Sequence, residues 1–188
     1  MKQFEELGTL DRAVYKAIAT TATPELDGQF RRLSKVADHS VLWLGIGSVI
    51  AVTGGEDGRR AAIESMLAVG ATSAVVNLGI KPVARRRRPA RAEPAQFEAR
   101  VVPMPESASF PSGHAASAFA FAYAVGRHLP GLAVPLRLLA GGVAYSRVHT
   151  GVHYPGDVAI GAILGAGIAA IVGAASDRRL GPARPRPT

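Results

Sequence analysis

The chain has 188 residues, a net charge of +8, an apolar fraction of 48% and a mean hydropathy of +0.17. This combination predicts one domain in which apolar helices lie in a membrane and basic residues flank them. The absence of cysteine excludes disulfides, thiolate nucleophiles and Cys-ligated metal centres. Because residues 1–10 are polar and acidic, we expect no cleavable signal peptide.

Residues 1–37 are expected to form amphipathic helices that lie at the membrane interface. Apolar residues recur there at helical spacing on either side of Pro24, among charged residues: Leu10, Val14, Ile18, Leu26, Phe30 and Leu33.

Residues 38–177 contain apolar stretches that approach the length of about 20 residues that a membrane helix needs. Five stretches qualify: 39–53, 61–80, 115–128, 132–145 and 158–175. They are rich in small residues, which let helices approach closely in lipid, and Gly161, Gly165, Ala166 and Gly167 are predicted to form a helix contact face. The fold class is therefore an all-α, polytopic transmembrane bundle of about five helices, with a polar loop at 89–111 and a basic, disordered tail at 178–188.

The run Arg85-Arg86-Arg87-Arg88 raises the question of nucleic acid binding. The surrounding sequence lacks interleaved aromatic residues, and the run directly follows an apolar segment. Anionic headgroups or a phosphate substrate therefore explain it better, and we expect no nucleic-acid partner. Arg85, Arg86 and Arg87 are expected to anchor a helix end at the headgroups.

Three polar clusters lie on one face of the membrane if the five helices alternate in direction. They are Lys81 to Pro89, Pro111-Ser112-Gly113-His114, and Ser146 to Asp157. Together they resemble the three signatures of the type 2 phosphatidic acid phosphatase family: Lys, six residues, Arg-Pro; Pro-Ser-Gly-His; and Ser-Arg, five residues, His, three residues, Asp. Each position of these signatures is matched in order, so the resemblance covers residues 81–157 by motif.

The resemblance implies a phosphate site formed by Lys81, Arg88, Ser112, Gly113 and Arg147. The residue types suit this role. Charge spreads over three oxygens of a phosphoryl group in transfer, and fixed cations and N–H donors stabilise it. Pro111 to His114 also opens a predicted helix, whose N-terminus favours an anion.

The resemblance also implies that His153, His114 and Asp157 are catalytic. A neutral imidazole at His153 can attack phosphorus if Asp157, four residues on, accepts a hydrogen bond from its other nitrogen. His114 would protonate the leaving alkoxide and later activate water. The implied mechanism is covalent, proceeds in two steps, and needs no cofactor or metal.

Several alternatives remain open. His149 and His153 could be metal ligands together with Asp157, although Gly151, Pro155 and Gly156 interrupt a regular helix there. A vanadate-dependent haloperoxidase has a similar phosphate pocket, and a non-catalytic lipid-phosphate binder or transporter could retain one.

The expected substrate is a lipid phosphate or a polyprenyl phosphate or diphosphate, and membrane lipids are expected partners. The sidedness of the site in the cell membrane stays open. The distribution of Lys and Arg favours the cytoplasmic face, whereas the family resemblance favours the extracytoplasmic face.

Overall fold

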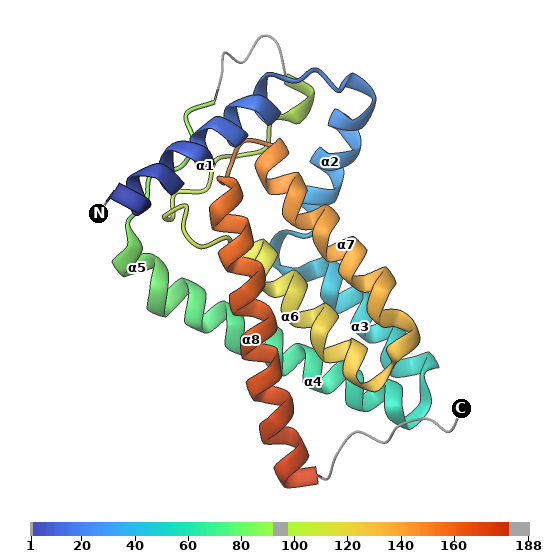
Figure 1. Ribbon diagram of the computed structural model, residues 1–188. Coiled ribbons are helices and arrows are strands. Elements are labelled where there is room, and N and C mark those ends of the chain that lie inside the picture. The colour runs from blue at the N-terminus through green and yellow to red at the C-terminus, as the bar shows by residue number, and fades with distance from the viewer. Residues whose placement is uncertain (1, 92–97, 181–188) are drawn as a thin grey trace.

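The computed structural model describes residues 2–91 and 98–180, and within these ranges all regular structure is helical (Figure 1). The prediction of an all-α fold is confirmed. In chain order the elements are α1 (Lys2–Thr20), α2 (Pro24–Val36), the 3₁₀ turn η1 (Asp38–Ser40), α3 (Val41–Thr53), α4 (Gly55–Ala74), the π-helical turn η2 (Val75–Ile80), α5 (Lys81–Ala84), the 3₁₀ turn η4 (Glu98–Arg100), α6 (Gly113–His128), α7 (Pro130–His149) and α8 (Pro155–Leu180).

Helix α6 lies at the centre of the bundle and packs against α4, α7 and α8. It carries alanine on several sides, and small side chains allow close helix packing in a membrane. On α8, a Cβ at Gly161 would lie 2.5 Å from the carbonyl oxygen of Ser112, and one at Gly165 would collide with the carbonyl of Ala116. The predicted contact face is therefore confirmed at Gly161 and Gly165, whereas Gly167 is exposed.

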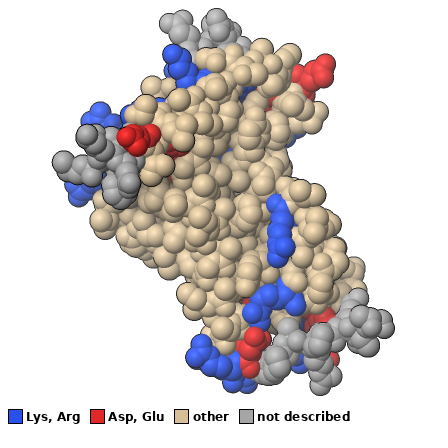
Figure 2. Space-filling model, in the orientation of Figure 1, with Lys and Arg blue, Asp and Glu red and all other residues tan. Residues whose placement is uncertain are grey.

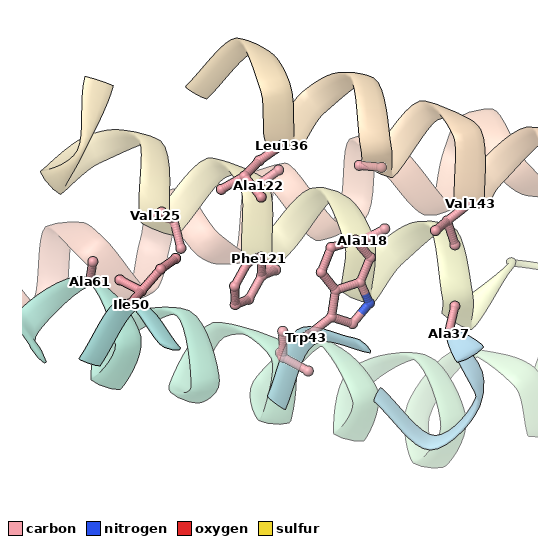
Figure 3. Close-up of a cluster of buried hydrophobic side chains, with 12 residues drawn as sticks. Ala37, Trp43, Ile50, Ala61, Ala118, Phe121, Ala122, Val125, Leu136 and Val143 are labelled. Atoms are coloured by element: carbon pink, nitrogen blue, oxygen red, sulfur yellow. The ribbon is translucent and has the colours of Figure 1, made fainter. Parts of the chain in front are cut away.

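A cluster of buried apolar side chains joins α3, α6 and α7 (Figure 3). Trp43 on α3 is fully buried, and its ring lies 5.1 Å from that of Phe121 on α6, measured between centroids. Leu136 on α7 and Val125 on α6 belong to the same cluster. This packing fixes the position of α3. The turn η1, which directly precedes α3, lines the cavity described below.

Two stretches within the described ranges are long and apolar enough to cross a membrane, Gly55–Ala84 and Pro155–Arg179. The pair Pro24–Val36 and Asp38–Thr53 passes the same test together, with a bend of 62° between its halves. Each of the five predicted segments lies within a helical stretch, although α3 and α6 have only 13 and 16 residues. Figure 2 shows a broad middle region of this face with few charged side chains, as a membrane-facing surface requires.

Helices α1 and α2 cover the end of the bundle at which α7 ends and α8 begins (Figure 1). Asp27 connects α2 to η4 and α7, because its Oδ1 accepts hydrogen bonds from Arg100 Nε at 2.7 Å and from His149 Nε2 at 2.9 Å. His149 is thus buried against α2. At the other terminus, α8 continues to Leu180, so residues 178–180 of the predicted disordered tail are helical. Residues 181–188 of the predicted tail and 92–97 of the predicted loop lie outside the described residues.

Candidate active site

His153 lies in the short turn between α7 and α8, and the local sequence fixes that turn. Gly151 has a φ of +71°, a left-handed conformation that glycine adopts readily. The backbone N–H groups of Val152 and His153 donate to the carbonyl of Arg147 at 3.1 and 3.2 Å. The turn thereby places the imidazole in the interior, with 2% of the side chain exposed.

Asp157, in the first turn of α8, lies behind His153 and is fully buried. Its Oδ2 lies 3.6 Å from Nδ1 of His153, longer than a hydrogen bond, and this Nδ1 has no other hydrogen-bond partner in the described part of the chain. Catalytic hydrogen bonds are often long in a ligand-free enzyme and shorten when substrate binds. The geometry favours the tautomer with a proton on Nδ1, directed at Asp157, and a lone pair on Nε2.

Three donors hold the carboxylate of Asp157 in place. Arg86 Nη1 lies at 2.7 Å, Ser109 Oγ at 2.5 Å and the backbone N–H of Tyr154 at 2.9 Å. A carboxylate with this many donors stays ionised and immobile. It can therefore orient His153 and stabilise positive charge that develops on the ring.

The pKa of His153 is lowered to about 4, chiefly by burial and also by the charges of Arg88 and Arg147, while Asp157 opposes the shift. The imidazole is therefore neutral at neutral pH. Its Nε2 lies 3.3 Å from Nη1 of Arg88. A neutral nitrogen beside a guanidinium group has the position that the predicted nucleophile requires, because the guanidinium can bind an anion there.

Three cationic side chains line the same cavity as His153. Arg88 is held by the carbonyl of Ser107, 2.9 Å from Nε. Lys81 follows the π-helical turn η2, and its Nζ lies 3.4 Å from Oγ of the same serine. Arg147, near the end of α7, is buried and donates to Ser34 Oγ at 2.5 Å. Their charges are fixed before a ligand arrives, which is the condition for stabilising a transferring phosphoryl group.

The N-terminus of α6 forms another part of the site. Ser112 is the N-cap residue: its Oγ accepts from the N–H of Ala115 at 3.4 Å, and its own N–H donates to the carbonyl of Asp157 at 2.9 Å. The side chain is buried and does not line the cavity, so its predicted role as a phosphate donor stays a prediction. Gly113 does line the cavity, and a Cβ there would lie 3.8 Å from Nζ of Lys81.

His114 enters the same cavity from α6. Its Nε2 lies 2.7 Å from Oδ1 of Asp38, in the turn between α2 and α3. Burial lowers the pKa of His114, and the hydrogen bond to Asp38 opposes this shift. A histidine that releases its proton readily is suited to act as a general acid.

One cavity of about 450 Å³ collects these side chains. The predicted site residues on its wall are Lys81, Arg88, Gly113, His114, Arg147 and His153. Within the described ranges, no group of three or more His, Cys, Asp or Glu side chains is arranged to hold a metal ion.

The sequence analysis assigned Arg86 to the headgroups, and the structure corrects this assignment, because Arg86 contacts the predicted catalytic residue Asp157. Besides Asp157, its guanidinium contacts Asp11 Oδ2 on α1 at 2.6 Å and lies 4.3 Å from the ring centroid of Tyr154. Nothing in a run of four arginines distinguishes this one. Only the folded chain brings Asp11, 75 residues away, beside it.

A membrane bundle with a neutral histidine, a second histidine and three fixed cations around one cavity has the groups that phosphoryl transfer requires. Residues 61–180 match the family model of the PAP2 superfamily. The chain belongs to this superfamily, as the motifs predicted, and is an integral-membrane phosphatase.

Two relatives are each named decaprenylphosphoryl-5-phosphoribose phosphatase. The protein of Mycobacterium tuberculosis (strain ATCC 25618 / H37Rv) is 39% identical over 144 residues, which cover 76% of each chain. That of Mycolicibacterium smegmatis (strain ATCC 700084 / mc(2)155) is 36% identical over 138 residues, covering 70% of this chain and 68% of that protein.

Two crystal structures share the fold. The PAP2 type phosphatidylglycerolphosphate phosphatase from Bacillus subtilis superposes with a TM-score of 0.70 at 25% identity, over 93% of this chain and 88% of that one. LpxE of Aquifex aeolicus superposes with a TM-score of 0.66 at 25% identity, over 87% of this chain and 94% of that one. Both superpositions therefore cover a larger share of this chain than residues 61–180, which match the family model.

Proposed function

We propose that this phosphatase removes a terminal phosphate from a polyprenyl-linked sugar phosphate through a phosphohistidine at His153. The observation that carries the mechanism is the position of Nε2 of His153, 3.3 Å from Arg88, in a cavity that His114 also lines. The two relatives named decaprenylphosphoryl-5-phosphoribose phosphatase support a polyprenyl carrier that bears a sugar phosphate.

In the first step, Nε2 of His153 attacks phosphorus in line with the bond to the leaving oxygen. The N–P bond forms as the P–O bond breaks, and the cations stabilise charge on the three equatorial oxygens. His114 gives its proton to the leaving oxygen, which departs as a neutral alcohol. The positive charge that the ring of His153 acquires is stabilised by Asp157, 3.6 Å from Nδ1.

In the second step, water attacks the phosphohistidine. The now neutral His114 takes a proton from this water, an O–P bond forms and the N–P bond breaks. Inorganic phosphate leaves, and Nε2 of His153 recovers its lone pair. Both histidines thus return to their starting protonation states.

An apolar groove between α3 and α7 supports a lipid substrate. It encloses about 500 Å³ and is lined by Val36 and Val41, among others. These two residues flank the turn of residues 37–40, which lines the catalytic cavity. A polyprenyl chain in this groove would bring its head group to that turn.

The test is turnover by the purified, detergent-solubilised protein on a panel that includes a polyprenylphosphoryl sugar phosphate, phosphatidic acid, phosphatidylglycerol phosphate and a prenyl diphosphate. We expect turnover to be fastest with the first substrate. Rapid quenching with ³²P-labelled substrate should trap a protein-bound phosphate that is stable to base and labile to acid. His153→Asn should abolish both turnover and labelling, and full turnover by this variant would overturn the mechanism.

A further inference from the structure

Asp38 is a carboxylate in the wall of the phosphate cavity, and the proposed mechanism gives it no role. It lies outside the residues that match the family model, 61–180. The two residues after it have left-handed backbone conformations, with φ of 53° at His39 and 61° at Ser40. Such conformations are unfavourable for residues other than glycine and persist only where surrounding structure enforces them. The turn therefore holds Asp38 in the cavity at an energetic cost.

The position of Asp38 is defined by its contacts with the catalytic groups. Its Oδ1 lies 2.7 Å from Nε2 of His114 and 3.6 Å from Nη1 of Arg147. Both contacts use Oδ1, which leaves Oδ2 for a ligand. Because His114 protonates the leaving oxygen, Asp38 lies beside the leaving group, whereas Arg88 lies beside the nucleophile His153.

The residues of α4 and η2 that line the cavity next to these groups are polar and uncharged. Asn77 and Ser73 line the cavity there, and Nδ2 of Asn77 donates to Oγ of Ser73 at 3.1 Å. Asn77 belongs to the π-helical turn η2, and such turns are frequent at functional sites. The Oδ1 of Asn77 lies 3.8 Å from the position of a Cβ on Gly113, next to His114.

We propose that Asp38, together with Asn77 and Ser73, forms a subsite that selects a leaving group whose unit next to the scissile phosphate is an uncharged, hydroxyl-rich sugar. Sugar hydroxyls can donate to the carboxylate and to the amide oxygen. In a diphosphate the leaving group is itself a phosphate, and its negative charge would be repelled by the carboxylate of Asp38. The subsite therefore favours a phosphate monoester of a sugar over a prenyl diphosphate. This inference rests on the proposed function.

The test compares kcat/KM for two substrates on the same lipid, a polyprenylphosphoryl sugar phosphate and the corresponding prenyl diphosphate, in the wild-type protein and in Asp38→Asn. This variant keeps the shape of the side chain and removes its charge. We expect the wild type to prefer the sugar phosphate, and the variant to reduce this preference by about tenfold, as loss of one charge contact would. The most direct evidence for the subsite would be a kcat/KM for the diphosphate that is higher in Asp38→Asn than in the wild type.

Glu25→Gln is the matched control, because Glu25 is exposed on α2 and its loss removes the same charge outside the cavity. Its substrate preference should equal that of the wild type. If Asp38→Asn lowers both rates in the same ratio, Asp38 only orients His114 and the inference is overturned. If the wild type hydrolyses neither substrate, the proposed function itself fails. If it hydrolyses both with equal kcat/KM, the inference alone fails.

Discussion

Arg86 Nη1 lies 2.7 Å from Oδ1 of Asp157, and Arg86 links this predicted catalytic residue to the first helix of the chain. The other terminal nitrogen of Arg86 contacts Asp11 of α1 at 2.6 Å. Asp11 also accepts the backbone N–H of Gly156 at 2.7 Å. Helix α1 therefore braces both the carboxylate behind His153 and the start of α8.

Replacing Arg86 with methionine should reduce kcat by about tenfold or more, with a smaller effect on KM. Tenfold corresponds to about 1.4 kcal/mol of transition-state stabilisation, close to the lower end of the range of about 1.5–3 kcal/mol for one hydrogen bond to a charged group. Steady-state kinetics on a lipid phosphate measure it. Arg87→Met is the control, because Arg87 is exposed in the same run, and it should retain full kcat. Equal losses in both variants would contradict a specific role for Arg86.

The pH profile of kcat/KM should be bell-shaped and centred in the weakly acidic range. The nucleophile must be neutral, and because burial lowers the pKa of His153 to about 4, activity should fall only as pH drops towards 4. The general acid must be protonated. Because burial also lowers the pKa of His114, its proton is lost below the ordinary value of about 6.5, and activity should fall as pH rises through that region.

His114→Gln tests the assignment of the alkaline limb. The variant should be slow and should lack the alkaline limb, because the group whose proton is lost has been removed. Its acid limb should remain near that of the wild type. An alkaline limb that persists unchanged would show that a different group, such as the substrate phosphate, causes it.

Removal of metal ions should leave turnover unchanged. The positive charge that stabilises the transferring phosphoryl group is supplied by Lys81, Arg88 and Arg147, each on the cavity wall. The measurement is the hydrolysis rate before and after treatment with EDTA, followed by addition of Mg²⁺ or Zn²⁺. A rate that falls with EDTA and returns with either ion would contradict this prediction.

Gly165→Ala should destabilise the bundle, because the added Cβ collides with the backbone carbonyl of Ala116 on α6. Overpacking of this kind costs about 1–3 kcal/mol, and the unfolding temperature in detergent should fall. Gly167→Ala is the control: a Cβ there meets nothing within 4 Å. That variant should be as stable as the wild type or more so, because alanine favours a helix. Equal unfolding temperatures for the two variants would refute the packing argument.

Much of the fold could be predicted because its signals are local. Apolar stretches of suitable length gave the positions of the membrane helices, and Gly161 and Gly165 marked a real contact face. The number of spans was harder to predict, because α3 and α6 are short and α2 joins α3 through a sharp bend. Length and hydropathy cannot separate a short buried helix from a membrane span.

The sequence by itself determined the family, the all-α class and the residues of the three motifs. Each motif spans few residues, so its residue types and spacing can be recognised without knowing the fold. Only the tertiary structure decided which groups surround the two histidines. Asp38 meets His114 across 76 positions and Arg86 meets Asp11 across 75. Pairings at such separations depend on how helices pack, and no local spacing encodes them.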